Sequence, residues 1–380
     1  LLHSRRPDRT GPQAAAHPAR RPARAVDPAA MDPAHLLEDP ALRTGRGPLL
    51  RVTARTASAM RRRVARAWEA GDLLRLVRGV YCPVSDWCAA APWDRFTLAA
   101  SAVVLARPDA VFTGPTAAHL HGLPLVETPR TLHVRATTPH HHGRSALVRQ
   151  ALAPGSAMAR IPAPPTLSPV WSPMSAPGHE PGEVLLRTAR GDVVGTAWVE
   201  PLATVHLQLA AGLPRRESVA PLDRLLRHRP RECAAWARAH AEVPASRAAR
   251  ERFAWACAFA DGASESPGES LSRVLMDELG FVPPVLQHRL RAPGGAQEDR
   301  LDFWWPQVGV GGEFDGITKY DVGLHASEAD RRRAIRAEKE REVRLRRRLS
   351  GLARWTWADL RSPARLEAEL VRHGVPRRRG

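Results

Sequence analysis

The sequence predicts an α+β protein. In a chain of 380 residues, stretches with helical spacing of apolar side chains alternate with short runs of β-branched and aromatic residues that glycine or proline bounds. The apolar fraction of 43% excludes a wholly disordered chain, and the length allows two or three domains with cores of their own. No run approaches the ~18 apolar residues that cross a bilayer, so we expect no membrane segment.

The chain is strongly basic, with 57 Lys+Arg against 39 Asp+Glu and a formal net charge of +18. Such a charge attracts polyanions, so DNA is the expected partner. A membrane surface is a weaker candidate, because no basic amphipathic helix with an aromatic face is present. The four cysteines are too few for a disulfide framework and lack the C-x-x-C spacing of a zinc site. We therefore expect a reduced, cytoplasmic protein.

The first predicted folded unit is a basic helix over residues 56–69 followed by a short hairpin over 73–81. Apolar side chains repeat at helical spacing in the first segment, and Gly71 ends it. A basic helix followed by a small hairpin is the outline of a winged helix-turn-helix. The candidate DNA contacts on this helix, phosphate more than base edges, are Arg61, Arg62, Arg63 and Arg66. A solvated helix face is the alternative.

The C-terminal part has the predicted element order αβββαβα. Ser266 caps a helix that begins at Pro267, and strands follow at 285–290, 301–305 and 308–314. A long charged helix, a fourth strand and a final helix complete the order at 331–349, 352–357 and 358–371. An antiparallel hairpin that leads into a right-handed crossover gives a mixed sheet with helices on its faces.

Three acids gather around the third of these strands. Glu313 and Asp315 share one face of a strand, and Asp302 lies opposite Glu313 if the hairpin loop is 306–309. Carboxylates so close repel one another without a cation, and oxygen ligands suit Mg²⁺ or Mn²⁺. The set therefore predicts a metal site of Asp302, Glu313 and Asp315, which could activate water for attack on a phosphodiester. Isolated acids at strand ends are the alternative.

Neighbouring residues would assist this site. Lys319 could place a positive charge on the scissile phosphate, and Glu269 could enter from the preceding helix as a fourth acid. Three glycines on the strand of Glu313, at 309, 311 and 312, indicate that something approaches the backbone closely. The helix 331–349 and the residues just after it carry a basic excess that favours phosphate. The candidate DNA contacts there are Arg333, Arg336, Lys339 and Arg344.

Residues 264–372 resemble a known family in an ordered series of motifs. These are Ser264-Glu-Ser-Pro-Gly-Glu-Ser-Leu-Ser-Arg273, Gln287, Arg300-Leu-Asp-Phe303, Glu313-Phe-Asp-Gly316 with Lys319-Tyr320, Glu338-Lys-Glu-Arg-Glu342 and Arg354-Trp-Thr-Trp-Ala-Asp-Leu360. They are similar to the restriction-endonuclease-like domain related to very-short-patch repair endonucleases, of the type found in actinobacterial proteins.

That resemblance implies a PD-(D/E)XK core. Glu269 would be the acid on the helix, Asp302 the metal-binding aspartate and Glu313 the second metal ligand. Asp315 stands where the family's lysine is expected, and Lys319 is the candidate replacement. The departure leaves two hypotheses open: a metal-dependent deoxyribonuclease, or a domain that only binds DNA or a partner.

The N-terminal part resembles a second family. Leu74-Arg-Leu-Val-Arg-Gly-Val-Tyr81 and Thr113-Gly-Pro-Thr-Ala-Ala-His-Leu-His-Gly-Leu123 are similar to the AbiEi-type antitoxins of abortive-infection toxin–antitoxin systems. The resemblance implies a winged helix that binds promoter DNA and a possible toxin partner.

The predicted organisation follows from these units. It comprises a disordered basic arm (1–32), a winged-helix, AbiEi-antitoxin-like domain (33–135), a Pro-rich linker or insertion (136–182), a helical connecting region (183–262), a PD-(D/E)XK nuclease-like domain (263–373) and a basic tail (374–380).

Overall fold

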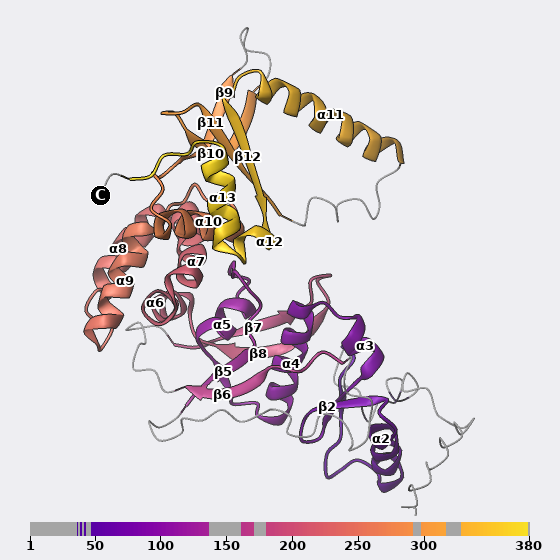
Figure 1. The fold of residues 1–380 in the computed structure, drawn as a ribbon. Coiled ribbons are helices and arrows are strands. Elements are labelled where there is room, and N and C mark those ends of the chain that lie inside the picture. Colours follow the sequence, from indigo (N-terminus) through magenta and orange to yellow (C-terminus); the bar gives the residue numbers. More distant parts are fainter. Residues whose placement is uncertain are drawn as a thin grey trace, which may run out of the picture.

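The computed structural model describes residues 47–136, 161–170, 180–291, 298–316 and 328–378, together with Leu36, Asp39 and Leu42. Within these residues the chain is an α+β protein with three sheets. Two sheets lie in the N-terminal half, a set of helices follows, and the third sheet lies in the C-terminal part (Figure 1). The predicted basic arm 1–32 lies outside the described residues.

The N-terminal unit is a helix on a small sheet. Strands β1 (Leu50–Arg51), β3 (Val80–Pro83) and β2 (Leu73–Val77) form an antiparallel sheet in that order, and α2 (Ser58–Ala70) packs against it. Gly71 ends α2 in the left-handed conformation, with a φ of 88°. Apolar side chains from α2, β1 and β2 share one core. The predicted basic helix and hairpin are therefore confirmed.

A five-stranded sheet follows, in the order β6-β5-β4-β8-β7. Its strands are β4 (Val111–Phe112), β5 (Thr131–Arg135), β6 (Thr166–Val170), β7 (Gly182–Arg187) and β8 (Val193–Val199). The helices of this part are α3 (Val84–Ala89), α4 (Pro92–Ala106) and α5 (Gly114–Leu120). The α4 side chains from Phe96 to Val103 are buried, because the helix packs between the two N-terminal sheets.

This sheet corrects the predicted organisation. Strand β6 lies inside the predicted linker 136–182 and pairs in parallel with β5, so this part of the linker belongs to the core. Residues 183–199 were predicted to be helical, which is wrong: they form most of the hairpin β7–β8, and β8 pairs in parallel with β4. The predicted boundary at 183 therefore falls within a strand.

Four helices connect this half to the C-terminal sheet. They are α6 (Leu202–Gly212), α7 (Arg215–His228), α8 (Pro230–His240) and α9 (Arg247–Phe259), so the helical prediction holds from residue 202 onward. Asp223 on α7 is buried and forms an ion pair with Arg273 at 2.9 Å. Since Arg273 lies on α10 (Pro267–Glu278), this pair ties the helical part to the C-terminal part.

The C-terminal sheet has the order β12-β11-β10-β9. Strands β9 (Val285–Arg291), β10 (Glu298–Trp305) and β11 (Val310–Asp315) are antiparallel, and β12 (Gly351–Thr356) is parallel to β11. Helix α11 (Glu328–Arg346) makes the crossover and extends away from the sheet, while α12 (Trp357–Leu360) and α13 (Pro363–Arg372) complete the chain (Figure 1). The predicted order of helices and strands is found here, except that the predicted final helix 358–371 is divided into α12 and α13.

The glycines of β11 meet the protein's own side chains. A Cβ on Gly312 would lie 2.8 Å from the Trp355 ring and 3.0 Å from the Trp305 ring, and Gly311 is enclosed by leucines in the same way. Gly309 has a φ of 66° and serves the turn. The close approach predicted at these glycines is thus made by the core, so the glycines do not indicate a ligand.

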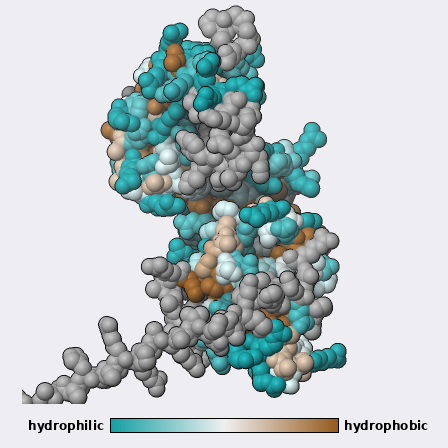
Figure 2. All heavy atoms as spheres, turned by 90° about the vertical axis from the view of Figure 1, so that its right-hand side faces the viewer, coloured by the Kyte–Doolittle hydropathy of each residue, from teal (hydrophilic) through white to brown (hydrophobic). Residues whose placement is uncertain are grey.

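None of the described helices is both long enough and apolar enough to cross a membrane. The face of the molecule in Figure 2 is mostly hydrophilic, with hydrophobic colours in small scattered patches.

Candidate functional site

The register of the C-terminal sheet places two of the predicted acids in one row of side chains across its strands. In β10 and β11, Phe303 pairs with Gly312, so the ladder continued by one residue places Asp302 opposite Glu313, as the sequence predicts. The hairpin turn occupies residues 306–309, also as predicted. On the far side, Glu313 pairs with Arg354 of β12. The same register places Gln287 of β9 opposite Asp302.

Glu313 is enclosed by two arginines. Its side chain is 4% exposed; Arg341 of α11 donates to Oε1, and Arg354 lies 3.0 Å from Oε2. Arg341 also donates to the Arg300 carbonyl oxygen at 2.9 Å. Because a guanidinium of the same chain binds each carboxylate oxygen, the negative charge of Glu313 is already compensated, and a divalent cation would be repelled by two nearby arginines.

Glu269 is a second buried carboxylate, and local donors hold it. Oε2 accepts from the Glu265 backbone N–H at 2.8 Å and from Gln287 Nε2 at 2.9 Å, while Oε1 accepts from Ser266 Oγ at 2.8 Å. Burial raises the pKa of Glu269, and the Asp302 carboxylate adds to this rise against the hydrogen bonds. Glu269 is therefore close enough to Asp302 for their charges to interact.

The other predicted metal ligands are Asp302, which lies in this row, and Asp315 at the end of β11. Asp302 Oδ2 accepts a hydrogen bond from the Phe314 backbone N–H at 3.0 Å, and Asp315 ends β11 in a half-buried position. Lys319 lies outside the described residues. In the described part of the chain, no group of three or more His, Cys, Asp or Glu side chains is placed to hold a metal ion. The metal site therefore stays a prediction.

Gln287 is a residue at this site to which the sequence assigned no role. It has a φ of 50°, which is uncommon for a residue other than glycine. Its Nε2 binds Glu269, while its buried Oε1 has no hydrogen-bond partner among the described residues. No signal in the sequence reveals this conformation, since β9 reads as an ordinary strand.

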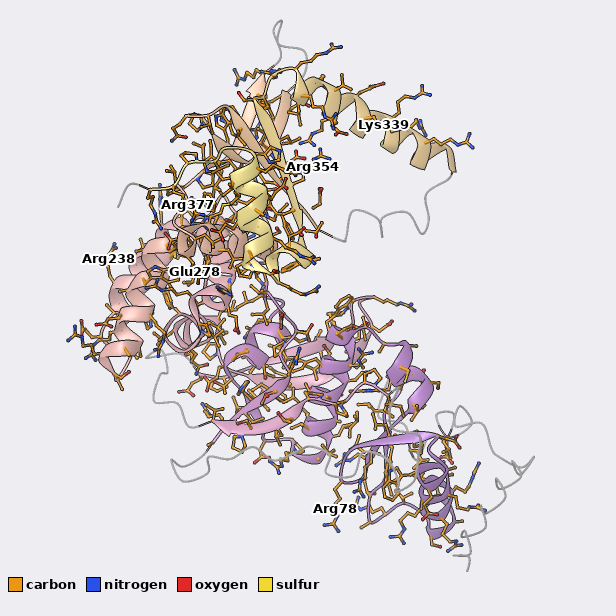
Figure 3. All side chains as sticks on the ribbon, viewed as in Figure 1. Arg78, Arg238, Glu278, Lys339, Arg354 and Arg377 are labelled. Atoms are coloured by element: carbon orange, nitrogen blue, oxygen red, sulfur yellow. The ribbon has the colours of Figure 1, made fainter. Side chains whose placement is uncertain are left out.

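The predicted DNA contacts of α11 divide into two groups. Arg333, Arg336 and Lys339 are exposed, and Figure 3 marks Lys339 on the projecting helix. Arg344 instead binds both oxygens of buried Asp299, at 2.9 and 3.2 Å. Its guanidinium is therefore engaged within the protein.

On α2 the arginines lie away from the core. Val64 and Ala67 are buried against the small sheet, whereas Arg61, Arg62 and Arg66 are exposed and Arg63 is half-buried. Within the residues that the structure describes, Arg61, Arg62 and Arg66 form no ion pair with a carboxylate. The outer face of α2 is thus a row of charges available to an anion.

The sequence did not identify the two arginines around Glu313 as site residues. Arg341 and Arg354 both stand in motifs of the nuclease-like resemblance, but neither motif gave them a role, and their charge counted only toward the basic excess after β11. Their contact with Glu313 depends on the parallel pairing of β12 with β11 and on the path of α11, which no local pattern specifies.

Two curated proteins of Mycobacterium tuberculosis are similar to the chain: the uncharacterized proteins MT2308 of strain CDC 1551 / Oshkosh and Rv2248 of strain H37Rv. Each is 31% identical over 180 residues, which is 45% of this chain and 59% of the relative. The chain thus matches a little over half the length of these relatives. No family model matches the chain, and no solved structure matches it.

Proposed function

We propose that the protein is a cytoplasmic DNA-binding regulator that resembles the AbiEi antitoxins. In this proposal α2 and the hairpin β2–β3 act as a winged helix on duplex DNA. The C-terminal sheet with its helices acts as a nuclease-like domain that binds DNA or a partner, such as a toxin, without cleaving a phosphodiester. The observation that carries the proposal is the exposed arginine row of α2, formed by Arg61, Arg62 and Arg66.

The dimensions of α2 support DNA binding. A helix of 13 residues is about 20 Å long, and the major groove, about 12 Å wide, admits such a helix. Arginines that no carboxylate neutralises can bind phosphates without first losing a partner within the protein. The tip of the β2–β3 hairpin adds exposed Arg78 beside the same unit (Figure 3).

The enclosure of Glu313 supports binding without cleavage. A Mg²⁺ site needs ionised carboxylate oxygens that are open to the cation. Glu313 has Arg341 and Arg354 on its two oxygens, and these cations neutralise the carboxylate that the PD-(D/E)XK resemblance would use as a metal ligand. Asp315, which stands in place of the expected lysine, also supports binding without cleavage.

The test is the affinity for a fluorescently labelled DNA duplex, measured by anisotropy over a series of salt concentrations. If three phosphate contacts are lost, the triple variant R61A/R62A/R66A should bind more weakly, with a salt slope smaller by about 3. The matched control R224A/R231A/R238A removes the same charge from exposed positions on α7 and α8. Equal losses in both variants, or none in the first, would contradict a specific role of α2.

A metal-dependent nuclease is the second candidate, and the position of the carboxylates favours it. Asp302 lies opposite Glu313 in the ladder, and Asp302 contributes to the raised pKa of Glu269. In that case Asp302 and Glu313 would hold Mg²⁺ or Mn²⁺, with Asp315, Glu269 and Lys319 assisting. The metal should then raise the melting temperature of the wild-type chain and leave that of Asp302→Ala unchanged.

A further inference from the structure

A pocket lies between the two N-terminal sheets, and it shares Arg78 of the β2–β3 hairpin with the proposed winged helix. It has a volume of about 450 Å³ and is lined by β1, the turn between β2 and β3, the end of α4 and one residue of β6. Small-molecule sites usually have volumes of roughly 300–1,000 Å³. The pocket is therefore large enough for a ligand of nucleotide size.

The charge of the pocket is entirely positive. Arg51, Arg78 and Arg107 line it, and none of its described lining residues is acidic. In the described part of the chain, none of these three guanidiniums has a carboxylate partner. Three like charges around one pocket repel one another, so an anion there is stabilised. The end of α4 contributes a partial charge of only about −0.5, which three full positive charges outweigh.

The backbone that carries two of these arginines is fixed. The Val52 backbone N–H donates to the Gly79 carbonyl oxygen at 2.7 Å, which joins the hairpin tip of Arg78 to the strand end of Arg51. Gly79 has a φ of 80°, and a Cβ there would lie 2.7 Å from the Val52 oxygen. Only glycine fits this turn without strain, so the backbone positions of the two arginines are set before any ligand arrives.

The inner wall of the pocket is apolar. Val77 comes from β2, Val103 and Leu105 come from α4, and Leu167 comes from β6. A pocket with cations and an apolar wall suits a ligand that has a phosphate at one end and a flat, weakly polar group at the other. The convex backbone of a DNA duplex supplies phosphate but no group that would enter such a pocket.

We propose that this pocket binds a nucleotide, with its phosphates on the arginines and its base against the apolar wall. Because the lining comes from both N-terminal sheets, a bound nucleotide would contact the α2 unit and the five-stranded sheet at once. A small-molecule effector site of this kind goes beyond the proposed DNA binding and does not depend on it.

Isothermal titration calorimetry of the full chain with AMP, ADP and pyrophosphate tests the proposal. We expect one site that binds ADP more tightly than AMP, because charge adds affinity, and more tightly than pyrophosphate, which has no base. Arg78→Ala and Arg107→Ala should each weaken ADP binding by about tenfold or more. The control Arg238→Ala, on the exposed face of α8 (Figure 3), should leave it unchanged.

A second variant tests the space in the pocket independently of its charge. Ala106 lines the pocket and is exposed, so Ala106→Trp should fill the space and abolish binding with every arginine in place. Three results would overturn the proposal: no binding of either nucleotide at about 1 mM, pyrophosphate binding as tightly as ADP, or wild-type affinity in the arginine and tryptophan variants. If bound DNA duplex displaced ADP mole for mole, the arginines would belong to the DNA-binding surface instead.

Discussion

Replacing Glu313 with glutamine should destabilise the C-terminal sheet by about 2–3 kcal/mol. Removing one partner of a buried ion pair costs about 3–5 kcal/mol, because the remaining charge is left uncompensated. Glu313 is 4% exposed, but Arg341 and Arg354 keep 23% and 30% of their side chains in contact with water. Water therefore offsets part of the loss, and the expected cost lies below the full range.

Urea denaturation followed by tryptophan fluorescence measures this cost. Trp305 and Trp355 are buried in the core beneath the Glu313 strand, so the emission changes when this sheet unfolds, together with the contribution of Trp87 from the N-terminal core. Glu340→Gln is the matched control, since Glu340 is exposed on α11 and its loss should change the unfolding free energy by no more than about 0.5 kcal/mol.

The sign of the change distinguishes the two interpretations of Glu313. If Glu313 belonged to a cluster of carboxylates that lacks its cation, neutralising it would relieve repulsion and stabilise the metal-free protein. An unfolding free energy of Glu313→Gln equal to or above that of the wild type would therefore refute the arginine enclosure.

Three further predictions concern other described contacts. Asp223→Ala should lower the unfolding free energy by about 3–5 kcal/mol in thermal melts, because it leaves Arg273 without its carboxylate; a loss below about 1 kcal/mol would show that the pair is dispensable. Burial and, to a smaller extent, the nearby Asp302 raise the pKa of Glu269 above its ordinary 4.5. The neutral Glu269 side chain therefore contributes fully to the stability of the folded state below pH 4.5, and this contribution is lost as the pH rises through the folded pKa. Glutamine imitates the neutral form, so the stability of Glu269→Gln relative to wild type should increase from about pH 4 to about pH 8 in urea titrations, and a pH-independent difference would contradict this. Gly268→Ala should destabilise by about 1–3 kcal/mol in the same assay, because its Cβ would lie 2.0 Å from the ring of Phe314; an unchanged midpoint would mean that the helix shifts freely.

The C-terminal fold could be predicted because its signals are local. Ser266 caps α10 through a hydrogen bond to the Glu269 backbone N–H, and the loop 306–309 sets the register of β10 and β11. Once the loop is placed, the position of Asp302 opposite Glu313 follows from the ladder alone. These features need no information from distant parts of the chain.

What the sequence did not predict depends on distant pairing. Strand β6 is proline-flanked and short, and it becomes a strand only beside β5. The hairpin β7–β8 joins the sheet through β4, which lies some eighty residues earlier in the chain. The enclosure of Glu313 has the same origin, because Arg341 and Arg354 reach it only after the α11 crossover is complete.

Incubation of supercoiled plasmid with the full chain, in Mg²⁺ and separately in Mn²⁺, separates binding from cleavage most directly. We expect the plasmid to be retarded in a gel by the wild-type chain and by Asp302→Ala alike, and to stay supercoiled once the protein is removed. Nicked or linear plasmid that forms with the wild-type chain and not with Asp302→Ala would contradict a DNA-binding protein that leaves the backbone intact.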